Sequence, residues 1–152
     1  MKIKYLLFYF LLISCADKIE KTSDPIEKSE YILNAISNEK YELVRNQFVG
    51  RKETTEKHKG TLDTLSMEIF KAIKKYGLPK RNQIIVVGKE KLGIPKDYGD
   101  EFNGDFVDVI STKINLGQKK EFEIRMGFII EKNEVRLLRM GADDLTKDSH
   151  LR

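Results

Sequence analysis

The residue with the most distinctive chemistry in this chain is Cys15, because it is the only cysteine among 152 residues. A lone thiol cannot form a disulfide within the chain, and one thiol is too few to build a cysteine metal site. Cys15 follows Ser14 and an uninterrupted apolar run, 5–13, which begins after Lys2 and Lys4. A positive end, a short apolar run and a small residue before a cleavage point are the parts of a secretory signal. The run is about half the ~20 residues that a membrane-spanning helix needs, so a permanent transmembrane anchor is the weaker interpretation.

The four residues Leu12-Ile13-Ser14-Cys15 resemble the lipobox of bacterial lipoproteins, in which an aliphatic residue, a tolerant position and a small residue precede the modified cysteine. In that family the thiol takes a diacylglycerol, the signal is cut away, and the new N-terminus is usually acylated too, which gives the two signals that stable anchoring needs. The resemblance implies that residues 1–14 are removed and that Cys15 binds membrane lipid. It also implies a place in the cell envelope, on the outer membrane if the bacterium has one. An ordinary signal peptide with an accidental cysteine is the alternative.

The charges of the mature chain are nearly balanced. Two of the 28 Lys and Arg residues lie in the signal, so 26 remain against 24 Asp and Glu, and the net charge after cleavage is +2. Nucleic-acid binding needs positive charge clustered on one face, whereas the signs here alternate along most of the chain. The sequence therefore predicts no nucleic-acid partner. Residues 15–23 are charged and almost free of apolar side chains, which is typical of a flexible spacer behind an anchor.

The first part of the domain has helical patterns. Asp24-Pro25 combines a good N-cap with a good first helical residue, and a break at Ser37-Asn38 separates that helix from an apolar stripe that ends at Gly50. A polar loop, 51–60, follows. The most regular helix comes next and ends at Gly77. Its apolar residues lie three or four apart: Leu62, Leu65, Ile69, Ile73 and Tyr76.

After this helix the apolar period changes to two, which favours strands over 83–87, 106–116, 122–131 and 135–140. Lys132-Asn133 is a candidate tight turn. We expect the helix residues Leu62, Leu65, Ile69 and Ile73 to pack on one face of the third strand, which bears Phe122, Ile124, Met126 and Phe128. Helices followed by an antiparallel meander predict one α+β domain over 24–142, with N-terminal helices on a curved four-stranded sheet, and a polar tail over 143–152.

This order of elements resembles the NTF2-like, cystatin-like group of α+β domains. The resemblance covers most of the mature chain and rests on the helix 35–48, the helix ending at Tyr76-Gly77 and the two long strands, without a signature motif. Members include pocket enzymes such as ketosteroid isomerase, transport adaptors and many small secreted domains without known activity. The resemblance therefore leaves the function open.

Asp108 is the weak catalytic candidate, because it interrupts the apolar residues that share its parity, Phe106 and Ile110. If that face is the core face, the carboxylate points at the helices or into the mouth of a pocket, where NTF2-like enzymes place their acids. In the alternative, Asp108 is an exposed carboxylate or pairs with Arg125 or Arg139.

The other polar groups give weaker patterns, and we predict neither a metal nor a cofactor. His58 and His150 are the only histidines, so a His-rich metal site or a Ser-His-Asp triad has little support. Gly88-Lys89 lacks the glycine spacing of a phosphate loop. An acidic loop has oxygen ligands but fails the EF-hand spacing: Asp97, Asp100, Glu101, Asn103 and Asp105. A basic stretch can touch anionic headgroups or a partner, but its composition is also that of a soluble loop: Arg51, Lys52, Lys57, His58 and Lys59.

These observations favour a non-catalytic envelope lipoprotein whose domain binds another envelope protein or a small ligand. One alternative is a small pocket hydrolase or isomerase of the NTF2-like type, which requires Asp108 to line an apolar cavity with a second polar group. Another is an immunity-type lipoprotein that neutralises a toxin, which requires a large exposed patch of complementary charge.

Overall fold

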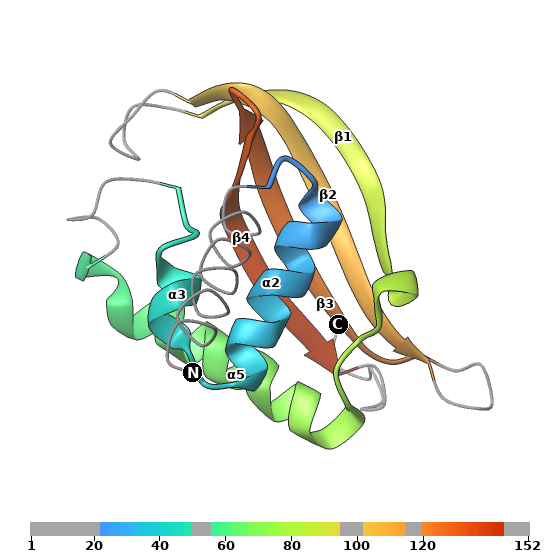
Figure 1. Cartoon of the computed structure of the whole chain (residues 1–152). Coiled ribbons are helices and arrows are strands. Elements are labelled where there is room, and N and C mark those ends of the chain that lie inside the picture. Colours follow the sequence, from blue (N-terminus) through green and yellow to red (C-terminus); the bar gives the residue numbers. More distant parts are fainter. Residues whose placement is uncertain (1–21, 50–55, 95–101, 115–119, 145–152) are drawn as a thin grey trace, which may run out of the picture.

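The computed structural model describes residues 22–49, 56–94, 102–114 and 120–144 (Figure 1). Three helices and a short 3-10 turn precede the strands: α2 (Pro25–Ser37), α3 (Tyr41–Arg45), α5 (Lys59–Tyr76) and η1 (Arg81–Gln83). The strands are β1 (Ile84–Ile94), β2 (Phe102–Ile114), β3 (Lys120–Glu131) and β4 (Glu134–Asp144). They form an antiparallel four-stranded sheet in the order β1-β2-β3-β4. The α+β class and the antiparallel sheet are confirmed, whereas the signal and Cys15 lie outside the described residues.

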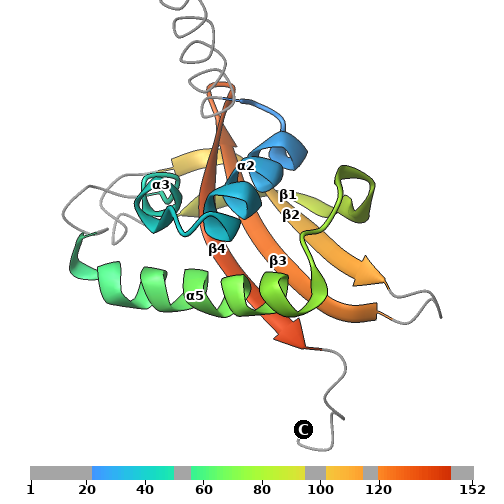
Figure 2. The same cartoon turned by 60° about the horizontal axis from the view of Figure 1, so that its bottom comes forward.

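The helices all lie on one side of the sheet, and α5 crosses it below α2 and α3 (Figure 2). The start of α2 follows the prediction, because the Asp24 side chain accepts a hydrogen bond of 2.8 Å from the Ile26 amide and Pro25 is the first helical residue. The end of α5 follows it too, since Gly77 adopts a φ of 90° directly after Tyr76.

The second helix is much shorter than predicted, so the expected helix over 35–48 is wrong. It ends at Arg45, and the chain from Gln47 to Val49 then runs beside β4. The Val49 amide donates to the Leu137 carbonyl at 2.8 Å, and the Leu137 amide donates to the Gln47 carbonyl at 2.7 Å. An edge strand leaves one row of backbone groups without partners, and the extended segment satisfies part of that row.

Two predicted loop boundaries also change. Residues 56, 57, 59 and 60 are helical although 51–60 was expected to be a loop; 51–55 lie outside the described residues. The strand β4 extends to Asp144, so the polar tail does not begin at residue 143. The turn between β3 and β4 is confirmed, because Lys132 and Asn133 have φ angles of 49° and 64°, as a two-residue hairpin turn requires.

The core lies between the helices and one face of the sheet, which we call the core face. The predicted packing is confirmed: Ile69 and Ile73 of α5 are buried in the same cluster as the apolar residues of β3, with Leu62 and Leu65 partly buried against it. At the end of α5 the Tyr76 ring stacks on Phe122 with ring centroids 5.2 Å apart. The members of the core on β3 are Phe122, Ile124, Met126 and Phe128.

Candidate functional site

Asp108 lies on the opposite side of the sheet, which we call the outer face. Its neighbours Val107 and Val109 belong to the core, and side chains alternate between the two faces along a strand. The possibility that Asp108 points at the helices is therefore wrong. The reason is that β2 carries apolar residues on both parities near Asp108, and the helices cover the parity that holds the two valines.

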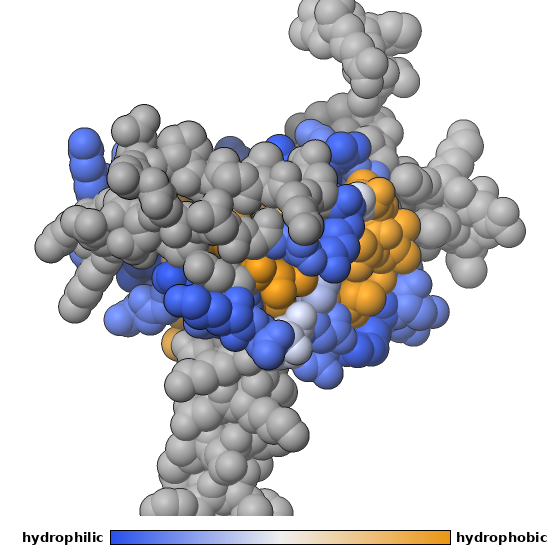
Figure 3. Space-filling view, turned by 90° about the horizontal axis from the view of Figure 1, so that it is seen from above, coloured by the Kyte–Doolittle hydropathy of each residue, from blue (hydrophilic) through white to orange (hydrophobic). Residues whose placement is uncertain are grey.

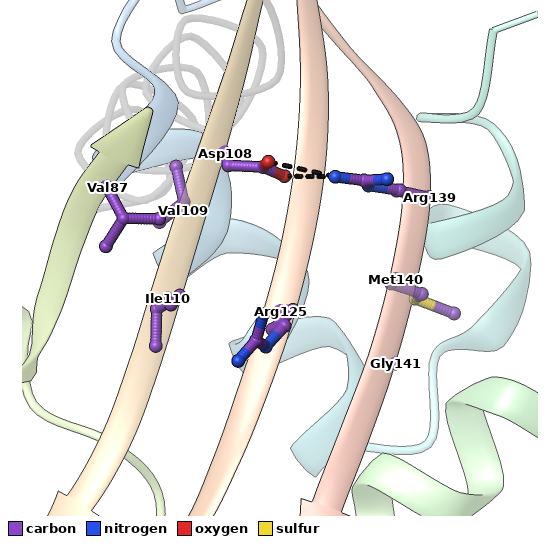
Figure 4. Close-up of a pocket in the computed structure, with 8 residues that line it drawn as sticks. All are labelled: Val87, Asp108, Val109, Ile110, Arg125, Arg139, Met140 and Gly141. Carbon is purple, nitrogen blue, oxygen red and sulfur yellow. Dashed lines mark hydrogen bonds and ion pairs between the residues drawn. The ribbon is translucent and has the colours of Figure 1, made fainter. Parts of the chain in front are cut away.

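Across the sheet, Asp108 forms an ion pair with Arg139. The Nη2 atom of Arg139 donates to both carboxylate oxygens of Asp108 at 2.9 Å, and Figure 4 shows the two side chains meeting over β3. The guanidinium carbon also lies 5.0 Å from the centre of the Phe106 ring, within the range of a cation–π contact. This is one of the pairings that the sequence left open for Asp108.

The ion pair depends on a glycine in the strand between the two residues. Gly127 of β3 lies opposite Asp108 on one side and opposite Arg139 on the other. A Cβ atom on Gly127 would lie 2.7 Å from the Cγ of Arg139 and 3.0 Å from the Cε2 of Phe106. Arg139 can therefore cross β3 and reach Asp108 because position 127 has no side chain.

Beside this ion pair the outer face has a shallow hollow of about 310 Å³ (Figure 4). A β-bulge between Val86 and Gly88 inserts Val87, which lies at one side of the hollow. The hollow extends over the four strands and is lined by Val87, Asp108, Val109, Ile110, Arg125, Arg139, Met140 and Gly141. Its ionised lining residues are two arginines and one aspartate, and Glu123, which pairs with Arg125, brings a second negative charge, so the charges balance.

Both arginines keep hydrogen-bond donors that no described residue uses. The Nε atom of Arg125 donates to Glu123 at 2.7 Å, and Arg139 is bonded through Nη2 alone. The terminal nitrogens of Arg125, and the Nε and Nη1 atoms of Arg139, make no hydrogen bond with the described part of the chain. The two side chains are 65% and 64% exposed. The arrangement can therefore donate several charge-assisted hydrogen bonds to an incoming anion.

The first strand adds apolar surface next to the hollow. Three consecutive residues of β1 are about half exposed: Ile85, Val86 and Val87 at 51%, 45% and 50%. Among the described residues β1 pairs with β2 alone, so it is an edge strand of the sheet. In the view of Figure 3, apolar surface forms patches set within hydrophilic surface.

Those of the remaining sequence candidates that the structure describes do not assemble into a site. His58 and its basic neighbours Lys57 and Lys59 are exposed at the start of α5. Lys89 forms an ion pair of 2.7 Å with Asp105 on the adjacent strand. Asn103 of the acidic loop lies in β2. His150 and five residues of the acidic loop and the basic stretch lie outside the described residues: Arg51, Lys52, Asp97, Asp100 and Glu101. Within the described ranges, no three His, Cys, Asp or Glu side chains lie close enough to hold a metal ion.

Two polar features of the structure escaped the sequence analysis. Lys28 is almost completely buried and donates from its Nζ atom to the Gln47 side chain at 2.7 Å, which joins α2 to the segment beside β4. Gly127 was not singled out either, although a glycine inside a strand often marks a close approach of another group. Burial raises the pKa of the Tyr41 phenol, and Glu39 and Asp63 add to the rise, but Tyr41 belongs to α3 and does not line the hollow.

Comparison with known proteins adds no family. The chain matches no protein-family model, no curated protein and no solved structure. In the described part of the chain, no helix has both the length and the apolar composition that crossing a bilayer requires. The features of the chain that bear on its function are therefore the geometry of the outer face and the residues around Cys15.

Proposed function

We propose that the protein is a cell-envelope lipoprotein whose domain is a non-catalytic binding module, and that the outer face of the sheet is its binding surface. The observation that carries the proposal is the hollow, where the donors of Arg125 and Arg139 lie beside the exposed apolar side chain of Val87. Arginine is enriched at protein–protein interfaces, and the buried centre of an interface is more apolar than its rim. The partner is an envelope protein.

The lipobox residues support the membrane anchor, and the fold supports a short tether. The Thr22 carbonyl accepts a hydrogen bond of 3.3 Å from the Val135 amide, close to the β3–β4 turn. Thr22 lies seven residues after Cys15 in the sequence, so the chain between them spans at most about 25 Å. A lipid on Cys15 thus keeps the domain within about one domain diameter of the bilayer. At that distance the domain can contact an envelope protein.

The position of Asp108 supports binding over catalysis. A pocket enzyme of the NTF2-like type requires an acid between the helices and the sheet, and that space is filled by core side chains such as Ile69 and Phe128, which are fully buried. Asp108 lies on the other face and is paired with Arg139. We retain the NTF2-like, cystatin-like arrangement as our proposal for the finer fold, because helices precede an antiparallel meander that they cover on one face.

An open surface favours a protein partner over a small ligand. Small-molecule sites enclose most of their ligand, commonly about 70–90% of its surface. The hollow instead lies on a sheet face, and its arginine side chains are about two-thirds exposed. A second protein can cover such a surface together with the edge of β1.

The anchor is tested by mass spectrometry of the mature N-terminus. We expect cleavage before Cys15 and a mass increase from acyl groups on that residue. A Cys15→Ser variant should lose the acyl mass and leave the membrane fraction. An intact Met1, or cleavage elsewhere with an unmodified Cys15, would show that the chain is not a lipoprotein.

The binding surface is tested by photocrosslinking in intact cells. A photoreactive residue at Val87 should give a discrete adduct with one protein, whereas the same residue at Met67 of α5, which is 46% exposed, should not. Equal adducts from both positions, or none from Val87, would contradict the proposal. The identity of the adduct separates an envelope partner from a toxin, which is the partner that an immunity-type lipoprotein would have.

A further inference from the structure

We infer that the partner protein adds a short extended strand to the free edge of β1, and that this strand is a run of uncharged, β-branched or aromatic residues. The inference depends on the proposed function, since it states how the partner contacts this side of the domain. The observation that carries it is the placement of three exposed apolar residues on both faces of the edge strand: Ile85, Val86 and Val87.

These three residues do not share one face of the sheet. Ile85 is opposite Ile110, which lines the hollow together with Val87, so Ile85 and Val87 lie on the outer face. Val86 is opposite Val109, a member of the core, so Val86 lies on the core face. All three side chains are about half exposed. Val86 is thus uncovered although it lies on the face that the helices cover.

An occupant in the plane of the sheet would cover both faces of this edge. A partner lying flat on the outer face would cover Ile85 and Val87 and leave Val86 exposed. A strand placed next to β1 would bring side chains beside all three, because its own side chains alternate between the two faces. The distribution of exposed apolar side chains therefore favours strand addition over docking on one face.

The backbone of β1 has the groups that strand addition requires. β1 is the outer strand of the sheet, and among the described strands it pairs with β2 alone (Figure 1). Between Ile85 and Gly88, no backbone group forms a backbone hydrogen bond with a described segment outside the sheet. An edge strand presents a row of such N–H and C=O groups, and an extended peptide can pair with them.

The opposite edge of the sheet already binds extended segments in this way. On β4, the Val135 amide donates to the Thr22 carbonyl, and Leu137 exchanges backbone hydrogen bonds with Gln47 and Val49. Leu137 is fully buried under this cover, whereas the apolar residues of β1 are about half exposed. The chain covers part of one edge of its sheet with its own backbone, and the partner's strand takes the corresponding place at the other edge.

The exposed side chains determine the chemistry of the added strand. A charged residue against Ile85 or Val87 would lose hydration without gaining an opposite charge, because Lys89, the nearest charged residue of β1, is paired with Asp105. β-Branched and aromatic residues form favourable cross-strand pairs with such side chains. Because both faces of the edge are apolar, the partner has apolar residues at consecutive positions. The bulge between Val86 and Gly88 interrupts the regular edge, so this run is short.

The first test places a photoreactive residue at position 86 of the full lipidated chain in intact cells. Val86 lies on the face opposite the hollow, so a contact there distinguishes strand addition from docking on the outer face. We expect the same envelope protein to be crosslinked from Val86 and from Val87. An adduct from Val87 alone would overturn strand addition and leave the proposed function standing. Adducts of twice the mass of the chain would identify a second copy as the strand and overturn the envelope partner, and no adduct from either position would contradict both proposals.

The second test measures strand addition directly with a peptide probe. The acetylated, amidated peptide Lys-Thr-Val-Val-Val-Thr-Lys is titrated into the full lipidated chain in detergent micelles, and NMR follows the hydrogen exchange of the β1 amides. We expect exchange to slow by about fivefold, the scale of one net hydrogen bond, at the amides of 85–88 that face away from β2. The amides bonded to β2 should change less. Unchanged exchange at a saturating peptide concentration would overturn the inference.

Two N-methylated forms of the peptide are the matched controls. They carry methyl groups on alternate sets of backbone nitrogens and keep the same side chains. In an added strand one set of N–H groups faces β1 and the other set faces away, so one form should bind about tenfold more weakly and the other should bind as before. Equal affinities of the two forms would show that the peptide binds through its side chains alone, which contradicts strand addition.

A pair of substitutions tests the contribution of the core-face side chain. Val86→Ser should weaken binding of the peptide by about two- to fivefold, the scale of one cross-strand pair. Met67→Ser is the control, because Met67 of α5 is exposed to the same extent and lies away from β1. Equal affinities of the two variants would show that Val86 does not contact the added strand and would overturn the inference. If Val86→Ser unfolds the chain, the N-methylated peptides still decide the result.

Discussion

The two faces of the sheet are made by the same four strands and differ in chemistry around Asp108. On the core face Ile124 and Phe128 are fully buried under the helices. On the outer face, Ile124 is followed by an exposed arginine, Arg125, and Phe128 is preceded by a glycine, Gly127. Because side chains alternate along a strand, one sequence can place stability on one face and recognition on the other. Substitutions on the two faces should therefore change different measurements.

The largest expected effect is on the core face. Phe128→Ala removes a fully buried ring between the helices and the sheet, and we expect the free energy of unfolding to fall by about 2 to 5 kcal/mol. Ile124→Ala should lie in the same range. Ile110→Ala on the outer face is the control and should cost less than ~1 kcal/mol. Chemical denaturation gives all three values, and unchanged midpoints for Phe128→Ala and Ile124→Ala would contradict the assigned core face.

A smaller effect is expected where the outer face is crowded. Gly127→Ala places a methyl group 2.7 Å from the Cγ of Arg139, so the arginine must leave Asp108 and Phe106. Such overpacking costs about 1 to 3 kcal/mol, and part is offset by the lower chain entropy of alanine in the unfolded state. We expect a net loss of about 1 kcal/mol in the free energy of unfolding, measured by denaturation.

The matched control for Gly127 is Gly141, also a glycine on the outer face. A Cβ there meets nothing within 4 Å, so Gly141→Ala should leave stability unchanged or slightly higher. Equal effects of the two substitutions would show that Arg139 does not need the gap over β3.

Local signals in the sequence predicted much of the fold. The start of α2 at Asp24-Pro25, the end of α5 at Gly77 and the turn at Lys132-Asn133 each depend on a few adjacent residues with defined backbone preferences. The apolar parity of β3 was also readable, because Glu123 and Arg125 alternate with its core residues.

The candidate site depended on contacts between distant segments, so the sequence could not place it. Apolar residues occupy both parities of β2 near Asp108, and the helices decide which parity is buried. The pairing with Arg139 further requires a bulge in β4, where Leu138 is the extra residue between Leu137, which is opposite Phe128, and Arg139, which is opposite Gly127. The end of α3 was mispredicted for the same reason, since the segment after Arg45 pairs with β4.

Ser111 on the core face has a polar group whose removal should stabilise the fold. The Ser111 hydroxyl is buried, and no residue in the described part of the chain forms a hydrogen bond with it. A buried hydroxyl without a partner costs about 1–3 kcal/mol. We expect Ser111→Ala to raise the free energy of unfolding by about 1 kcal/mol, measured by denaturation.

Ser66 provides the matched control for Ser111. It is equally buried, but its hydroxyl donates to the Leu62 carbonyl at 2.9 Å. Ser66→Ala should therefore leave stability unchanged or lower it slightly. If Ser111→Ala lowers the free energy of unfolding instead of raising it, the Ser111 hydroxyl has a stabilising partner.

Apart from the control substitutions, Asp108→Asn has the smallest expected effect on stability, although this residue has the most distinctive position on the outer face. Its ion pair with Arg139 is solvent-accessible, with 32% of the Asp108 side chain and 64% of the Arg139 side chain exposed. Exposed ion pairs contribute about 0–1 kcal/mol, because water screens the charges and two side chains must be held in one geometry. We therefore expect the free energy of unfolding of this variant, measured by denaturation, to differ from that of the unmodified chain by no more than this range. A loss above ~2 kcal/mol would mean that the ion pair holds β2 and β4 together, and the outer face would then contribute to stability as the core face does.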